Sequence, residues 1–86
     1  MTRQDAKTLF EITKLQKEFS RGIYPEDLVN KQVLSKRSCQ EKVKDLLSKG
    51  FLEEANEQGA NVYRVTVTGI NDMCAYRDIK IEYDKL

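Results

Sequence analysis

The side chains best suited to bind a charged partner lie in the segment SKRSCQEKVKDLLSK, residues 35–49. Its apolar residues recur on one side at helical spacing: Cys39, Val43, Leu46 and Leu47. The other side carries cations and hydrogen-bonding groups: Arg37, Glu41, Lys44 and Ser48. Such groups recognise phosphates and base edges. The pattern therefore predicts a helix with one side in a core and the other open to a partner.

The charge of the chain is concentrated around this helix. The 86 residues have a formal net charge of only +1. Residues 31–49 nevertheless hold six basic side chains against two acidic ones, whereas residues 50–61 hold three acidic side chains and no basic one. This asymmetry favours a basic binding segment followed by an acidic one.

No residue set in the chain has the composition of an enzyme active site or a metal site. The sequence lacks histidine, has no phosphate-binding glycine loop and contains only two cysteines. Glu53 and Glu54 are neighbours on an expected strand, so they point to opposite faces and form no carboxylate pair. We therefore expect neither catalysis nor a cofactor nor a metal.

Two free cysteines and the absence of a long apolar run predict a cytoplasmic protein without a membrane span. Cys39 and Cys74 are also candidates for redox sensing. Cys39 lies on the apolar side of its helix, however, where a cysteine is more often a small core residue. Neither cysteine has a neighbouring motif that would lower its pKa.

Periodicity and capping residues predict a single α+β domain over residues 1–86. Helices are expected at residues 2–20, 25–31 and 35–49. Gly22 is expected to end the first of these helices and Gly50 the third. A β-hairpin follows, with strands near 51–54 and 62–67. Tyr63, Val65 and Val67 alternate there with polar residues, which predicts one buried face. For residues 69–86 a helix capped by Thr68 is favoured over a strand.

Two stretches resemble the winged helix-turn-helix superfamily, in particular small transcriptional regulators of the MarR type. YPEDLVNKQVLSKRSCQEKVKDLLSKGFLEE is similar to a helix-turn-helix that runs into a wing strand. VYRVTVTGIN is similar to the returning wing strand and the start of a last helix. The resemblance spans about residues 9–71 and implies a three-helix core, a β-hairpin wing and a C-terminal helix.

The resemblance implies sequence-specific binding of double-stranded DNA, with residues 35–49 as the recognition helix in the major groove. Arg37 can then pair with guanine and Gln40 with adenine, whereas Lys36 reaches a phosphate. Glu41 either accepts from cytosine or repels the DNA. The expected DNA contacts are Ser35, Lys36, Arg37, Ser38, Gln40, Glu41, Lys44 and Arg64. The implied role is that of a repressor or autoregulator, with no operator or small-molecule effector indicated.

The acidic segment EEANEQGAN departs from this family, whose wings often carry Arg or Lys at the tip. Three alternatives therefore stay open. The lysines of residues 35–49 can serve solubility alone. The domain can bind a protein through Glu53, Glu54 and Glu57. It can also act on DNA in plasmid or phage replication or segregation.

Both terminal helices carry a second apolar patch. In the first helix the patch is Ala6 and Phe10, and near the C-terminus it is Ile70, Cys74 and Ile81. These residues can pack on each other within one core or form the seam of a homodimer. We favour the seam, which gives Phe10, Ile70, Cys74 and Ile81 as the expected dimer interface. A two-fold dimer would present two recognition helices to one face of the DNA.

Overall fold

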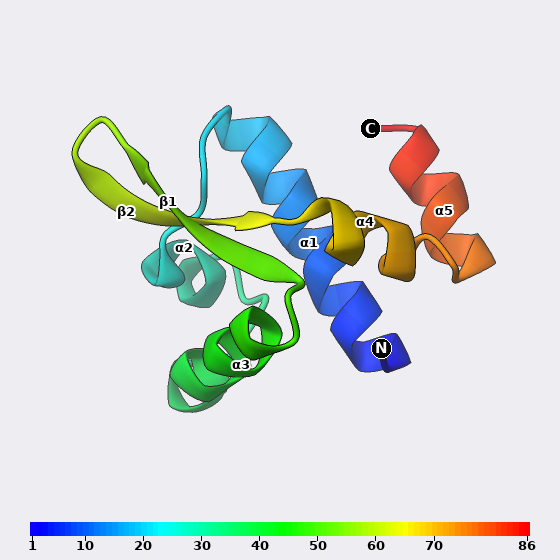
Figure 1. Cartoon of the computed structure of the whole chain (residues 1–86), viewed down its shortest axis with the longest axis horizontal. Helices are drawn as coiled ribbons and strands as arrows, with labels where there is room; N and C mark the ends of the chain where they lie inside the picture. The colour runs from blue at the N-terminus through cyan, green and yellow to red at the C-terminus, as the bar shows by residue number, and fades with distance from the viewer.

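A computed structural model describes residues 1–86 as one α+β domain with five helices and a two-stranded antiparallel hairpin. In chain order the elements are α1 (Arg3–Phe19), α2 (Pro25–Asn30), α3 (Lys36–Ser48), β1 (Leu52–Glu57), β2 (Ala60–Val65), α4 (Val67–Met73) and α5 (Arg77–Asp84). The hairpin projects at one side of the molecule, and α4 and α5 lie at the other, with α1 between them (Figure 1).

The first three helices occupy the expected segments because their local start and stop signals operate. Thr2 caps α1 and Ser35 caps α3, each hydroxyl accepting the backbone N–H of the residue three positions later. Pro25 stands in the first turn of α2. Gly50 adopts a φ of 78° directly after the α3 C-cap residue, as expected of a helix-ending glycine.

Gly22 has a different role from the one expected. The left-handed residue that ends α1 is Ser20, with a φ of 54°. Gly22 is buried against β2, where an added Cβ would lie 2.3 Å from Cγ2 of Val62. The glycine is therefore needed for close approach of two segments, not for the turn of the chain.

The hairpin is tighter and longer than expected. Its strands pair from Leu52 opposite Val65 to Glu57 opposite Ala60. The two-residue turn, Gln58 and Gly59, has φ values of 54° and 83°, as hairpin turns with two left-handed residues require. The isolated residue Ile23 pairs with Tyr63 on the other edge of β2 through two backbone hydrogen bonds, which confirms a brief extended segment before α2.

The C-terminal segment is helical, which confirms the preference for helix over strand, but it forms two helices, so the single continuous helix expected over residues 69–86 is wrong. Thr66, not Thr68, caps α4: its hydroxyl accepts the Gly69 N–H at 3.0 Å and donates to the Gly50 carbonyl at 2.6 Å. The strand accordingly stops at Val65, and Val67 is not on a buried strand face but is 74% exposed in the first turn of α4.

The core is built around α1. Leu9, Ile12 and Leu15 lie along its buried side, and Ala6 is fully buried as well. The other core residues come from every remaining element or its flank, namely Ile23, Leu28, Cys39, Val43, Leu46, Phe51, Leu52, Val65, Met73 and Ile79. α4, α5 and β2 pack against α1 (Figure 1). α3 packs mainly against α2 and β1 and is linked to α1 by the ion pairs of Asp5 with Lys42 and Lys49.

Candidate nucleic-acid interface

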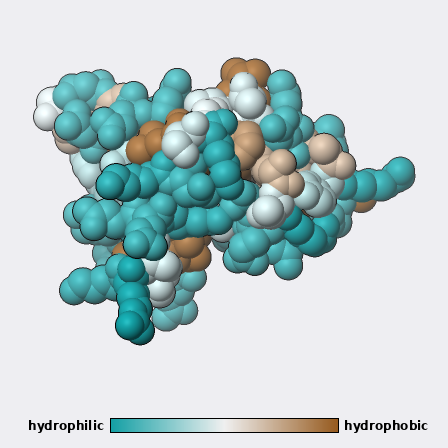
Figure 2. Space-filling view, turned by 60° about the horizontal axis from the view of Figure 1, so that its bottom comes forward, coloured by the Kyte–Doolittle hydropathy of each residue, from teal (hydrophilic) through white to brown (hydrophobic).

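The polar side of α3 is open to solvent. Arg37, Glu41, Lys44 and Ser48 are all exposed, whereas Cys39, Val43 and Leu46 are at most 5% exposed and belong to the core. Leu47 differs from its expected burial and is only half-buried. Hydrophilic residues dominate the face of the molecule seen in Figure 2, and apolar side chains appear there in small separate patches. The helix thus offers a polar surface on a rigid support.

Three cations of this surface have no acidic partner. Lys36, Arg37 and Lys44 are exposed and take part in none of the ten ion pairs of the structure. Their charges are therefore available to a phosphate without first breaking an internal pair. The exposed amide of Gln40 lies on the same helix.

The two expected serine contacts are engaged with each other at the start of α3. The Ser35 and Ser38 hydroxyl oxygens are 2.8 Å apart, and Ser35 also accepts the Ser38 N–H. Both residues remain exposed, so each hydroxyl has further hydrogen-bonding capacity toward solvent or a ligand.

Arg64 is the one expected contact that the structure separates from the α3 surface. Arg64 lies opposite Glu53 in the hairpin, and Tyr63 lies opposite Glu54. Since paired residues share a face and successive residues alternate, Arg64 and Tyr63 point to opposite faces. Tyr63 and Glu54 face α3 across a groove, which leaves Arg64 on the far side.

The Arg64 guanidinium is also occupied by Glu57. The two side chains form an ion pair, and Glu57 accepts the Gly22 N–H at 2.9 Å as well. Hydrogen bonds from Arg64 and from Gly22 hold the pKa of Glu57 below its usual value. Arg64, the only basic residue of the hairpin, is therefore paired within the hairpin. Glu53 and Glu54 are exposed and form no ion pair.

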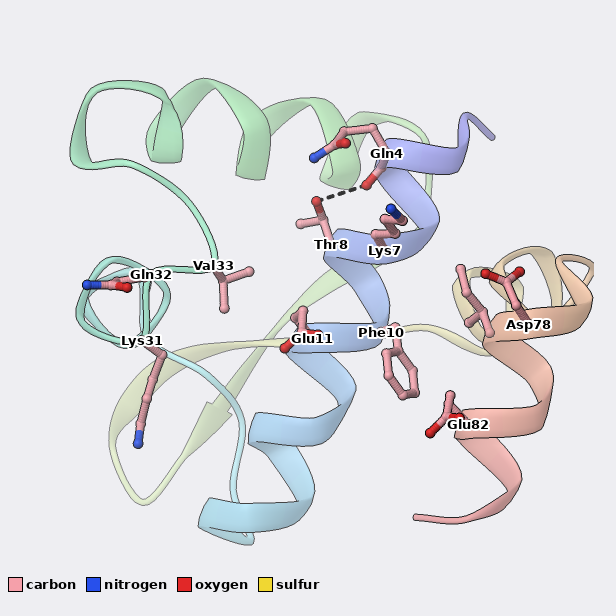
Figure 3. Close-up of a pocket in the computed structure, with 11 residues that line it drawn as sticks. Gln4, Lys7, Thr8, Phe10, Glu11, Lys31, Gln32, Val33, Asp78 and Glu82 are labelled. Atoms are coloured by element: carbon pink, nitrogen blue, oxygen red, sulfur yellow. Dashed lines mark hydrogen bonds between the residues drawn. The ribbon is translucent and has the colours of Figure 1, made fainter.

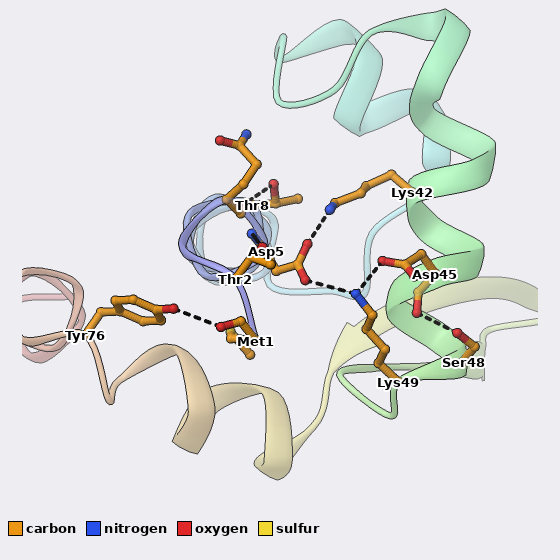
Figure 4. A network of polar contacts seen from close by, with 10 residues as sticks. Met1, Thr2, Asp5, Thr8, Lys42, Asp45, Ser48, Lys49 and Tyr76 are labelled. Carbon is orange, nitrogen blue, oxygen red and sulfur yellow. Dashed lines mark hydrogen bonds and ion pairs between the residues drawn. The ribbon is translucent and has the colours of Figure 1, made fainter.

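Sequence reasoning missed a charged cluster that joins α3 to α1 (Figure 4). Asp5, in the first turn of α1, is 1% exposed. It forms ion pairs with Lys42 and with Lys49, the latter at 3.2 Å. Lys49 also pairs with Asp45 at 2.9 Å. Local patterns gave Asp5 only a role at the helix N-terminus, because its partners lie 37 and 44 positions away.

Asp5 is ionised in this setting. Burial by itself raises the pKa of a carboxyl group, but the hydrogen bonds from Lys42 and Lys49 outweigh it, so the pKa of Asp5 lies below its ordinary value. The cluster is thus a charged pairing of one carboxylate with two ammonium groups.

A groove of about 730 Å³ lies between α2, α3 and the hairpin. Its apolar lining consists of Pro25, Val29, Cys39, Val43, Leu47 and Tyr63. Lys36, Gln40 and Lys44 border it from α3, and Glu26 and Glu54 from α2 and β1. Both signs of charge are present, so the groove does not select an anion.

Neither cysteine has the properties of a reactive thiol. Both are free. Burial raises the pKa of Cys39, and Glu26 adds to the effect; burial likewise raises the pKa of Cys74. Reactive cysteines need a lowered pKa, so the redox interpretation has no support here. No group of three or more His, Cys, Asp or Glu side chains is arranged to hold a metal ion.

The residues expected at a dimer seam differ in their exposure. Ile70 and Cys74 are half-buried and pack against the core of their own chain. Phe10 is half-buried and points from α1 toward α5, beside a hollow of about 490 Å³ (Figure 3). Ile81 is 47% exposed. Packing within the chain thus covers much of the second apolar patches, and Ile81 is the member most available to another molecule.

Comparison of the chain with known protein families, curated proteins and solved structures found no match. The structure contains no helix with the length and apolar character of a membrane span.

Proposed function

We propose that this chain is a winged helix-turn-helix protein that binds double-stranded DNA through the exposed side of α3 and regulates transcription as a dimer. The observation that carries the proposal is the set of free cations on that side, Lys36, Arg37 and Lys44, beside the exposed Gln40. A helix that is fixed to its domain on one side and offers such groups on the other suits the major groove.

The order of the elements supports the same interpretation. An N-terminal helix, a short extended segment at Ile23, two helices, a hairpin and a further helix follow one another as in a winged helix. In this arrangement α3 is the recognition helix and β1–β2 is the wing. This order is compatible with the winged helix but does not single it out, so the charge of α3 carries more weight.

The proposed contacts divide into two classes. Arg37 and Gln40 read base edges, since their side chains match guanine and adenine respectively. Lys36 and Lys44 bind phosphates and fix the orientation of the helix. The exposed Glu53 and Glu54 oppose close approach of the wing to the DNA backbone, so α3 supplies most of the affinity.

The double variant Arg37→Ala/Lys44→Ala tests the proposal. Duplexes are first selected from a random pool with the unaltered protein, and the dissociation constant is then measured at several salt concentrations. Loss of the Lys44 phosphate contact should reduce the magnitude of the slope of log K against log salt by about 1, and loss of the Arg37 base contact should further weaken binding to the selected duplex. The variant Lys7→Ala/Lys17→Ala removes the same charge from exposed sites on α1 and should bind normally. Unchanged affinity in the α3 variant would refute the proposal.

The exposed acidic residues of β1 favour a second candidate, a domain that binds a basic protein. The variant Glu53→Gln/Glu54→Gln separates the two. If α3 binds DNA, removal of two repelling charges strengthens duplex binding at low salt. If the hairpin binds a protein, the same variant loses its partner in a pull-down, and no duplex binds to the unaltered chain. Roles in replication or segregation use the same DNA contacts as the main proposal.

A further inference from the structure

Asp5 divides the cations of α3 into two groups. The first group, Lys36, Arg37 and Lys44, points into solvent without partners. The second group, Lys42 and Lys49, lies seven residues apart on the flank that faces α1, and both ammonium groups reach the Asp5 carboxylate (Figure 4). The Lys42 side chain is 24% exposed and the Lys49 side chain 43%. Two basic groups, one within α3 and one at its C-cap, are thus paired with a single residue of another helix.

The burial of Asp5 favours its ion pairs with Lys42 and Lys49. Its side chain is almost completely buried, and a buried carboxylate that loses its partners is left with an uncompensated charge. Pairing with an incoming phosphate would require Lys42 or Lys49 to leave that carboxylate. We therefore expect Lys42 and Lys49 to remain paired with Asp5 under conditions in which an exposed lysine without a partner binds a phosphate.

We infer that Asp5 is a positioning residue of the DNA-binding surface, which withholds Lys42 and Lys49 from phosphates and uses them to fix the orientation of α3 against α1. The inference rests on the proposed function. It implies that Asp5 increases discrimination between sequences: base contacts depend on the orientation of α3, whereas additional free lysines would strengthen binding to any DNA backbone.

Neutralisation of Asp5 should have two effects of opposite sign. In Asp5→Asn the two lysines become free to contact phosphate, so the salt slope for a random-sequence duplex should increase by about 1 to 2. The affinity for the selected duplex should increase less than the affinity for the random-sequence duplex, because α3 has lost its fixed orientation. The ratio of the affinity for the selected duplex to that for the random-sequence duplex should therefore fall. A purely structural role for Asp5 would weaken binding to both duplexes without a steeper salt slope.

Single charge deletions on α3 provide the matched comparison. Lys42→Gln and Lys44→Gln remove the same charge from the same helix, two residues apart. Lys44→Gln should lower the salt slope by about 0.9, and Lys42→Gln should leave it unchanged. The triple variant Asp5→Asn/Lys42→Gln/Lys49→Gln should return the slope to that of the unaltered chain. Circular dichroism is used to check that each variant is folded. If Asp5→Asn does not fold, the salt slopes of Lys42→Gln and Lys44→Gln alone test the role of Asp5.

Failure of this inference differs from failure of the proposed function. If the unaltered chain shows no salt-dependent binding to any duplex, the proposed function is refuted and the role of Asp5 with it. If the chain binds DNA but Lys42→Gln lowers the slope as much as Lys44→Gln does, only the role of Asp5 is refuted. A folded Asp5→Asn variant with an unchanged slope has the same meaning.

Discussion

At the residue scale, ionised carboxylates link the helices to one another and to the connection between α1 and α2. Asp5 of α1 pairs with Lys42 of α3 and with Lys49 at its C-cap. Asp27 of α2 accepts hydrogen bonds from Arg21 at 2.8 Å and from the Tyr24 N–H at 2.9 Å, and its side chain is 16% exposed. The hydrogen bond from Arg21 lowers the pKa of Asp27; burial opposes this effect, but the Tyr24 N–H reinforces it. Both carboxylates therefore favour the folded chain in their charged form.

These lowered pKa values predict a loss of stability in acid. A carboxyl group with a lower pKa in the folded than in the unfolded chain stabilises the fold above the unfolded pKa, near 4. That contribution disappears as the pH falls through the folded pKa. Thermal unfolding followed by circular dichroism should therefore show a midpoint that falls below about pH 4.

The variant Asp27→Asn tests the share of this one residue. It should cost about 1 to 2 kcal/mol of unfolding free energy at neutral pH, since it weakens a charged hydrogen bond, and it should flatten the acid limb of the stability curve. Asp84→Asn is the control, because Asp84 forms only an exposed pair with Lys80 on α5. Parallel acid limbs in the unaltered chain and in Asp27→Asn would contradict the assignment.

At the scale of elements, close contact between the α1–α2 connection and β2 fixes the position of the hairpin. Gly22 donates its N–H to Glu57, and the neighbouring Ile23 exchanges two backbone hydrogen bonds with Tyr63. The space at Gly22 is filled by Val62, which is 1% exposed. A side chain at position 22 would therefore push the hairpin away from the helical core.

We predict that Gly22→Ala destabilises the domain by about 1 to 3 kcal/mol, as overpacking in a core does. Val62→Ala removes Cγ2, the atom that the new methyl group meets most closely, at 2.3 Å. It keeps the Cβ of residue 62, which lies 2.7 Å from the new group, and it leaves a cavity where the valine methyl groups were. The double variant should consequently be more stable than the sum of the two single costs implies, by about 1 kcal/mol or more. Urea unfolding of the four proteins measures this coupling, and strictly additive costs would rule out the proposed clash.

Elements with local signals could be predicted from the sequence, and those decided by packing could not. Ser35 and Gly50 mark the ends of α3 through short-range hydrogen bonds and backbone conformation, and both predictions are confirmed. The chain after β2 has two possible caps, Thr66 and Thr68, and no glycine or proline marks the break between α4 and α5. Packing against α1 determines where α4 ends and α5 begins, because residues of both helices are buried against α1.

The candidate site shows the same division. The exposed side of α3 could be predicted because its apolar and polar residues alternate at helical spacing. The capture of Lys42 and Lys49 by Asp5 could not, since it depends on how two distant helices pack. The alternation along β2 shows that Arg64 and Tyr63 differ in face, but only the fold shows which face lies toward α3.

At the scale of the whole molecule, α1 separates the α3 surface from α5 (Figure 1). The α5 side carries Ile81, which is 47% exposed, and one border of the hollow beside Phe10, which α1 and residues 31–33 line from the other side. An association through this side would leave α3 uncovered in both copies. If two copies are related by a two-fold axis on this side, both α3 helices remain free to contact one duplex.

We predict that Ile81→Glu prevents self-association without disturbing the fold. The side chain is already exposed in the single chain, so the substitution costs little folding free energy, whereas a charge buried in an apolar seam is strongly unfavourable. Sedimentation should show two chains for the unaltered protein and one for the variant. Duplex binding should weaken because each complex then holds one α3 helix instead of two. Val67→Glu supplies the control, since Val67 is 74% exposed on α4 and belongs to no expected interface. If Ile81→Glu still sediments as two chains, the copies meet elsewhere. If the unaltered protein sediments as one chain, a single α3 helix must account for DNA binding.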